Sequence, residues 1–233
     1  MDYLDPYRLW NFIDWQSEKS RLSITDSRFI FKTLASAVMH CHDRGVIVRD
    51  LTPLNILVKK NFANNSNSSK AVDSAPYEVK IVDFSLAVRE GSREALCDHA
   101  LFDWAMVPYC APEALVVQPS HATEKDNGSS SSSSSSSAIV PVSYSRAMDM
   151  WSLGVLLFVM IAGRIPWEGY ERNCTVDDHL LLSNIQRAEY DFGDAIWKEA
   201  GEGVKKVIKR LLQVHEQQRM TAKEVMKNHW VTM

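Results

Sequence analysis

The pattern of apolar positions in the first third of the chain has the period of a helix and then that of short strands. From Ser27 to His42, apolar side chains recur every three or four residues, and Gly45 follows at the point where a helix would end. Three short runs rich in β-branched residues come next and predict small strands that bracket loops. These runs span residues 46–48, 56–58 and 79–82.

The second half of the chain is predicted to be mainly helical. Its most apolar stretch, residues 151–163, is too short to cross a bilayer, which needs about 20 residues. We therefore interpret it as a buried core helix, which is predicted to span residues 147–162. Further helical patterns cover residues 178–187, 203–214 and 221–229. The expected fold class is therefore mainly α with a few short β-strands.

Two segments lack the apolar residues that a packed structure needs. Residues 61–76 are dominated by Asn, Ser and Ala, and residues 120–138 contain an uninterrupted serine run from Ser129 to Ser137. Neither segment can bury enough apolar surface to offset the entropy lost on ordering. We predict two disordered insertions into surface loops of a single domain spanning residues 1–233, because long loops add little to the cost of closure.

Composition restricts the partners and the compartment. A chain of 233 residues that is 45% hydrophobic can bury a full core. Its formal net charge is −3 and it has no basic stripe, so we expect no nucleic-acid partner. Scattered cysteines and the lack of a signal-peptide pattern at Met1 favour a cytoplasmic or nuclear protein that is not in a membrane.

A loop between two predicted strands carries an acid, Asp50, and an amide, Asn55. A loop of this kind can aim a carboxylate at a substrate hydroxyl and an amide oxygen at a metal ion. A second acid, Asp83, ends the strand at residues 79–82 and is followed by Phe84, which we interpret as a core residue. The sequence Ala111-Pro112-Glu113 stands further along.

Together these segments resemble the protein kinases. The sequence from Val48 to Asn55 is similar to the family's catalytic loop, and Asp83-Phe84-Ser85 and Ala111-Pro112-Glu113 are similar to its D-F-G and A-P-E segments, in the family's order. The likeness continues through residues 149–154, 163–167 and 218–230. It implies a kinase C-terminal lobe, with the N-terminal lobe absent. Residues 185–192 and 207–212 resemble the calmodulin-dependent kinase group, which implies serine/threonine substrates.

The resemblance implies a role for each matching residue. Asp50 would accept the proton of a protein hydroxyl, while Asn55 and Asp83 would hold the Mg²⁺ ions that bridge the phosphates of ATP. Thr52 completes the predicted catalytic set and occupies the position of the lysine expected two residues after Asp50. Arg49 would ordinarily meet an activation-loop phosphate.

Three further implied sites follow from the resemblance. The residues Asp2, Tyr3 and Leu4 look like the hinge that contacts adenine, and Leu57 would form the floor beneath the adenine ring. With Asp83, these four residues form the predicted cofactor-binding set. An ion pair between Glu113 and Arg219 would tie the A-P-E segment to the end of the lobe.

The chain departs from the family at several positions. Val48 replaces the usual histidine, Ser85 replaces the glycine of the D-F-G segment, and Ala105-Met106 replaces a Gly-Thr pair. Between Ser92 and Tyr109 there is no serine or threonine to meet Arg49 as a phosphate. The glycine-rich loop and the lysine–glutamate pair that act on ATP have no match in the sequence.

Three hypotheses follow. The first is a serine/threonine kinase catalytic domain, present here as a fragment, that takes ATP, Mg²⁺ and a protein substrate. The second is a pseudokinase or regulatory scaffold that binds a protein partner without transferring phosphate. The third is an unrelated helical interaction protein in which the motifs are a coincidence. Trp151, Trp167, Trp197 and Trp230 are interpreted under all three as packing residues.

Overall fold

The computed structural model describes residues 8–12, 21–61, 76–92, 106–115, 144–168 and 178–233. Its helices are α1 (Leu9–Phe12), α2 (Ile24–His42), α3 (Arg146–Ala162), α4 (Asp178–Arg187), α5 (Ile196–Leu211), α6 (Ala222–Val225) and α7 (His229–Thr232). Its strands are β1 (Val46–Ile47), β2 (Ile56–Lys60), β3 (Tyr77–Ile81) and β4 (Val88–Arg89). The expected class, mainly helical with short strands, agrees with these elements.

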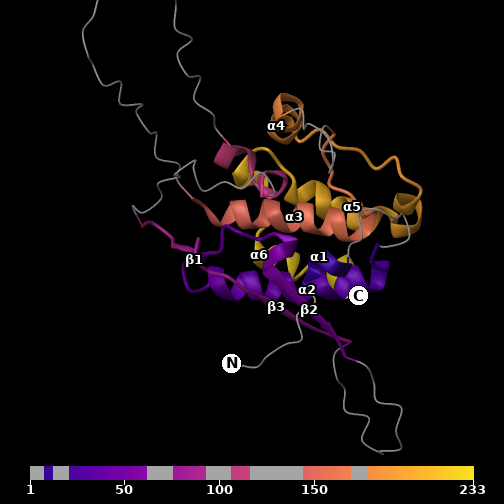
Figure 1. Cartoon of the computed structure of the whole chain (residues 1–233), viewed down its shortest axis with the longest axis horizontal. Helices are drawn as coiled ribbons and strands as arrows, with labels where there is room; N and C mark the ends of the chain where they lie inside the picture. The colour runs from indigo at the N-terminus through magenta and orange to yellow at the C-terminus, as the bar shows by residue number, and fades with distance from the viewer. Residues whose placement is uncertain (1–7, 13–20, 62–75, 93–105, 116–143, 169–177) are drawn as a thin grey trace, which may run out of the picture.

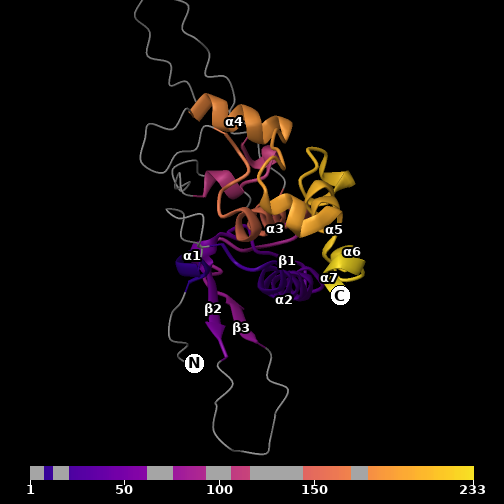
Figure 2. The same cartoon turned by 90° about the vertical axis from the view of Figure 1, so that its right-hand side faces the viewer.

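Helix α3 forms the centre of the molecule. In Figures 1 and 2 it runs between α2 on one side and α4 on the other, with α5 packed beside it. Every residue from Met148 to Ile161 is buried, as expected for a helix that is apolar on all sides. The prediction of a buried core helix is confirmed.

Two glycines determine how α3 packs against α5 and where it ends. A Cβ at Gly154 would lie 2.8 Å from Leu211 Cβ, so only glycine permits this approach of α3 to α5. Gly163 ends the helix with φ of 72°, and its N–H donates to the carbonyl of Val159. Such a left-handed residue is the usual way for a helix to end, and glycine adopts it without strain.

The four strands form two antiparallel pairs, β1 with β4 and β2 with β3. The pairing of β2 with β3 aligns Ile56 with Ile81 and Lys60 with Tyr77. This hairpin packs on α2 and projects from the helical body in Figure 2. All three predicted strands are present, although the first ends one residue earlier and the other two extend over five residues each.

Several helix boundaries differ from the predictions. Helix α2 begins at Ile24 because the Ser23 side chain accepts a hydrogen bond from the Asp26 N–H and caps the helix. Helix α5 begins at Ile196 and contains a break at Gly201, where φ is 79°. The single helix expected over residues 221–229 is divided into α6 and α7, because the Asn228 side chain accepts a hydrogen bond from the Trp230 N–H and caps α7, which begins at His229.

The predicted insertions at 61–76 and 120–138 lie almost entirely outside the described residues. At the ends of the first, the Asn61 N–H donates to the Pro76 carbonyl at 2.9 Å, so the segment leaves and returns at the same end of the β2–β3 hairpin. Across the described part of the chain, no helix combines the length and apolar character needed to span a bilayer.

The four tryptophans interpreted as packing residues are all buried. Trp151 and Trp167 stack with their rings 5.6 Å apart, and Trp167 Nε1 donates to the Pro108 carbonyl. That interpretation is confirmed. Cys41 and Cys110, the cysteines within the described residues, carry no disulfide.

Candidate active site

Strand pairing brings Asn55 and Asp83 to one end of the β2–β3 hairpin. Asn55 precedes the first residue of β2, and its carbonyl accepts a hydrogen bond of 2.9 Å from the Val82 N–H just beyond β3. In an antiparallel pair, residues before one strand lie beside residues after the other. Asp83 therefore emerges next to Asn55, although 28 positions separate them in the sequence.

The loop from Asp50 to Asn55 closes on itself. Pro53–Asn55 form a single 3₁₀ turn, in which the Asn55 N–H donates to the Thr52 carbonyl at 3.0 Å. The Asn55 side-chain amide then donates to Asp50, at 2.5 Å to Oδ2 and 3.4 Å to the carbonyl. These bonds hold the nitrogen of the amide against Asp50, so the amide oxygen remains as the atom that can bind a cation.

Asp149, in the first turn of α3, holds the start of this loop through hydrogen bonds to its backbone. Its Oδ1 accepts from the Arg49 N–H at 2.8 Å, while Oδ2 accepts from the Val48 N–H at 2.9 Å and from His42 Nε2 at 2.8 Å. The carboxylate is buried, and these donors supply the partners that a buried charge requires. Asp149 lies within the predicted core helix, but its role in holding the loop was not predicted. The available signal was a charged residue inside an otherwise apolar helix.

The carboxyl groups of Asp50 and Asp83 have pKa values shifted in opposite directions. Burial raises the pKa of Asp50, the Asn55 amide opposes that shift, and the negative charge of Asp83 adds to it. The hydroxyl and backbone N–H of Ser85 lower the pKa of Asp83, whose Oδ1 lies 3.0 Å from the Ser85 nitrogen. The effect of Asp83 on Asp50 is consistent with the two side chains facing one site. Within the described residues, the buried Oδ1 of Asp50 accepts no hydrogen bond.

Arg49 and Asp83, which flank this site, both have positive φ, at 69° and 64°. Ala188 is the third non-glycine residue with positive φ in the described part of the chain. Such backbone conformations cost about 1–3 kcal/mol each and gather at functional sites. The Arg49 guanidinium stacks on the ring of Tyr144, 3.7 Å from its centroid. Arg49, the arginine expected to meet a phosphate, thus makes a cation–π contact with Tyr144 in this structure.

The expected ion pair between Glu113 and Arg219 is confirmed. Arg219 Nη1 and Nη2 donate to the two carboxylate oxygens of Glu113 at 2.5 and 2.6 Å. The remaining guanidinium bonds go to the carbonyls of Gln213, Val214 and Ala147, and the group also lies over the Trp151 ring. The arginine side chain is 0% exposed, so this fork joins the A-P-E segment to the C-terminal end of the domain.

The other predicted site residues have different outcomes. Thr52 is 4% exposed, and its hydroxyl lies close enough to Asp50 to lower the pKa of that carboxyl, without a hydrogen bond of standard geometry. Leu57 lies in β2, opposite Lys80, and its backbone forms an isolated antiparallel β-bridge with that of Arg8. Asp2, Tyr3 and Leu4 lie outside the described residues.

The interpretation of Phe84 as a core residue is wrong. Its side chain is 46% exposed, whereas Asp83 before it is fixed by β3 and by the Ser85 N–H. The reason is that Phe84 follows the end of β3 and no described element covers it.

The chemistry of the site suits a cation held in part by phosphate oxygens. No group of three or more His, Cys, Asp or Glu side chains in the described residues could hold a metal ion. Asn55 and Asp83 supply one amide oxygen and one carboxylate. Mg²⁺ in proteins is commonly bound in this way, by one or two protein ligands together with water and the phosphates of a substrate.

Comparison with known proteins places this arrangement in a family. The model of the protein kinase domain family matches residues 1–231. The chain belongs to the protein kinase domain family, as the resemblance implied.

The curated relatives include several serine/threonine kinases. The chain is 27% identical over 214 residues to serine/threonine-protein kinase 33 of Bos taurus, covering 92% of this chain and 36% of the relative. It is 30% identical over 212 residues to the calcium/calmodulin-dependent protein kinase type II alpha chain of Drosophila melanogaster, covering 90% of this chain and 31% of the relative. The chain thus spans about a third of the length of these relatives.

Two solved structures share the fold over the whole of this chain. The crystal structure of Rad53 kinase domain and SCD2 has a TM-score of 0.66 and 23% sequence identity, with 64% of that chain covered. The same pair in complex with AMPPNP has a TM-score of 0.65 and 24% identity, with 68% covered. The central helix α3 and the loop that it anchors therefore belong to a known kinase architecture.

Proposed function

We propose that this chain provides the hydroxyl-activating and metal-binding parts of a protein serine/threonine kinase site. The observation that carries the proposal is that the register of β2 and β3 brings Asp83 beside Asn55 in the backbone, while the side-chain amide of Asn55 donates a hydrogen bond to Asp50. Serine/threonine kinases among the relatives, at 27–30% identity, support protein hydroxyls as the substrate class.

Asp50 is proposed to receive the proton of the substrate hydroxyl. Its Oδ2 is held by the Asn55 amide, while its Oδ1 makes no hydrogen bond of standard geometry within the described residues. The raised pKa brings the carboxylate closer to the working pH, which favours proton transfer.

Asn55 and Asp83 are the proposed ligands for Mg²⁺ and, through it, for ATP. The lowered pKa of Asp83 keeps its carboxylate ionised, as a metal ligand must be. A Mg²⁺ ion held by Asn55 and Asp83 would supply positive charge to offset the negative charge of the phosphates. The solved structure with AMPPNP supports a nucleotide at this fold, and Leu57 with the hinge residues Asp2, Tyr3 and Leu4 remain the proposed adenine contacts.

The proposed reaction needs parts that these 233 residues do not contain. The glycine-rich loop and the lysine–glutamate pair that act on the ATP phosphates in kinases have no match in the sequence. We therefore propose that the residues form the C-terminal lobe of a kinase and transfer phosphate only together with an N-terminal lobe. The exposed Phe84 is consistent with a surface that such a lobe covers.

A pseudokinase or regulatory scaffold is the second candidate function. It is favoured by the stack of Arg49 on Tyr144, by the buried Thr52 in the position of a lysine, and by Ser85 in the position of a glycine. In this case the fold would persist as a binding surface without phosphotransfer. The two candidates differ in whether Asp50 matters for a reaction.

To test the proposal, the protein encoded by the longest transcript that contains these residues is expressed. Transfer of the γ-phosphate of ATP to a peptide that contains serine or threonine is then measured. We expect Mg²⁺-dependent transfer that Asp50→Asn removes and that Asp43→Asn, at an exposed carboxylate paired with Lys223, leaves unchanged. Equal transfer by the wild type and Asp50→Asn would refute the role of Asp50. Absence of both transfer and Mg·ATP binding in a folded protein would favour the scaffold.

A further inference from the structure

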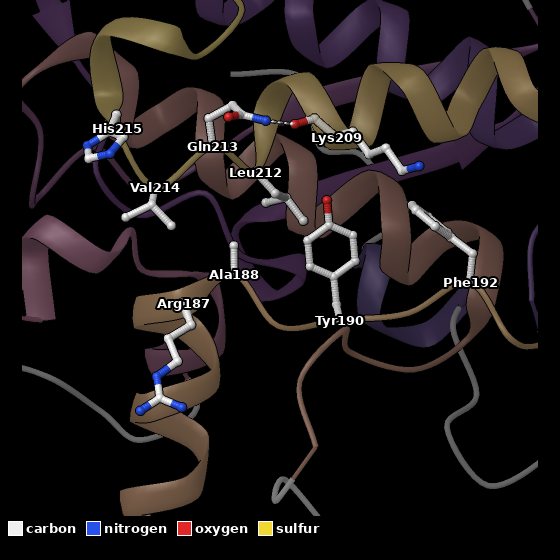
Figure 3. A pocket seen from close by; sticks show the side chains of 9 residues that line it. All are labelled: Arg187, Ala188, Tyr190, Phe192, Lys209, Leu212, Gln213, Val214 and His215. Carbon is white, nitrogen blue, oxygen red and sulfur yellow. Dashed lines mark hydrogen bonds between the residues drawn. The ribbon is translucent and has the colours of Figure 1, made fainter.

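A second concave site shares no lining residue with the catalytic loop. It is a pocket of about 680 Å³ where the C-terminal end of α4 meets the C-terminal end of α5 (Figure 3). This volume lies within the usual range for ligand-binding clefts. None of the roles proposed for Asp50, Asn55 or Asp83 involves it.

The floor of this pocket is a rigid aromatic cluster. Tyr190 packs edge-on against Trp167 and Phe192, with ring centroids 5.9 and 5.6 Å apart. Burial raises the pKa of Tyr190 to about 12, so the phenol is neutral. The buried Leu212 lines the pocket beside it. A preformed apolar floor of this kind loses little entropy when a partner side chain packs on it.

The rim of the pocket is basic. Arg187, Lys209 and His215 line it, and none of the lining residues is acidic, although the chain carries 29 acids against 26 bases overall. Arg187 makes only a long contact of 3.8 Å with Glu189, and both side chains are more than half exposed. A pair of this kind contributes little, so a partner carboxylate can replace it.

The basic groups lie at separate points around Tyr190 rather than converging on one spot. In Figure 3, Lys209 extends over Phe192, His215 lies beside Val214, and Arg187 extends away at the end of α4. This spacing does not suit a single small anion, which needs several donors on one group. It suits several negative charges spread along an extended chain.

Val214 adds an apolar contact at the rim. It is 37% exposed, one of four large hydrophobic side chains exposed in the described residues. Single exposed apolar side chains are common on protein surfaces, but Val214 lines the same pocket as Tyr190 and Leu212 and adds to its apolar surface. Val214 and Tyr190 both line the pocket, so an apolar side chain that enters it can contact both.

We propose that this pocket is a docking site for an extended acidic segment of a partner protein. One apolar side chain of that segment packs between Val214 and Tyr190, and the flanking carboxylates pair with Arg187 and Lys209. Docking here goes beyond phosphotransfer and does not depend on it.

The experiment measures binding of the intact chain to a labelled ten-residue peptide by fluorescence anisotropy. The peptide has glutamates on both sides of a central leucine and no serine, threonine or tyrosine, so it cannot be a substrate. Matched peptides carry glutamine for glutamate, or alanine for leucine. We expect binding that weakens with salt and that both substituted peptides reduce at least about tenfold.

Charge reversal on the protein provides the matched comparison. Arg187→Glu and Lys209→Glu should each weaken binding about tenfold, whereas Lys206→Glu, an exposed residue of α5 outside the pocket lining, should change it less than about twofold. Arg187 and Lys209 are exposed, so these variants should fold, and circular dichroism checks this. Arg187→Gln and Lys209→Gln give a milder second test.

Three outcomes would overturn the proposal. The acidic peptide could fail to bind at millimolar concentration, or the glutamine peptide could bind equally well. The Lys206→Glu variant could also weaken binding as much as Lys209→Glu. Sedimentation that shows self-association abolished by Lys209→Glu would instead assign the pocket to a second copy of this chain.

Discussion

The side-chain amide of Asn55 donates a hydrogen bond of 2.5 Å to Oδ2 of Asp50, five residues earlier in the same loop. This bond fixes one oxygen of the carboxylate and leaves the other buried and unsatisfied in the described structure. It also fixes which end of the amide can meet a metal ion. The two residues thus orient each other before any ligand is bound.

The anchoring of the loop by Asp149 predicts a large loss of stability when that carboxylate is removed. Asp149→Ala would leave the N–H groups of Val48 and Arg49 and the ring of His42 without their acceptor. We expect the free energy of unfolding to fall by about 3 kcal/mol or more, measured by urea denaturation with tryptophan fluorescence. His42→Leu keeps both backbone bonds and should cost clearly less. Equal losses in the two variants would contradict the anchoring role.

The fork between Glu113 and Arg219 predicts strong coupling in a double-mutant cycle. Glu113→Gln removes the charge that balances a fully buried guanidinium and should cost on the order of 3 kcal/mol, the low end of the range for buried pairs because Glu113 is 25% exposed. Arg219→Met should cost a similar amount. The double variant should lose much less than the sum, and strictly additive losses in denaturation would show that the pair is not coupled.

The backbone of Ala188 predicts a stabilising substitution. Its φ of 52° lies in the left-handed region, just past the end of α4, where glycine is favoured. Ala188→Gly should therefore raise the free energy of unfolding by about 0.5–1 kcal/mol. Ala37→Gly, inside α2, is the matched control and should lower it by a similar amount. The contrary outcome is destabilisation by both substitutions, observed in thermal melts.

The tight approach of α3 to α5 at Gly154 predicts a steric effect. Gly154→Ala would place a methyl group 2.8 Å from Leu211 Cβ, which is too close to its backbone to move aside cheaply. Overpacking of this kind costs about 1–3 kcal/mol, although alanine is the better helix former. A melting temperature at or above that of the wild type would show that α5 shifts freely.

Local pattern was sufficient to predict much of the fold but not the contacts between distant segments. Helix α3 and the short strands could be predicted because their side-chain periodicity is local. The role of Asp149 could not, because its backbone partners, Val48 and Arg49, lie about 100 positions earlier.

The same physical reason explains the other differences. Phe84 is a large apolar residue of the kind that is usually buried. Its exposure depends on which element of the fold packs over it, and the local sequence does not show this. The stack of Arg49 on Tyr144 joins residues 95 positions apart. Asp50, Asn55 and Asp83 could be proposed as site residues from their spacing within the family's motif order, but the position of Asp83 beside Asn55 follows from the β2–β3 register.

The most direct test of the central claim is a ¹³C NMR titration of the Asp50 side-chain carboxyl, compared with the same titration in Asp83→Asn. The account predicts a pKa for Asp50 above that of an ordinary aspartate, because of burial, and a lower pKa in the variant, because a neighbouring negative charge is gone. Asp43→Asn should leave the pKa of Asp50 unchanged, since Asp43 does not contribute to its shift. An Asp50 carboxyl that titrates as an exposed aspartate and does not respond to Asp83→Asn would contradict the convergence of the three side chains on one site.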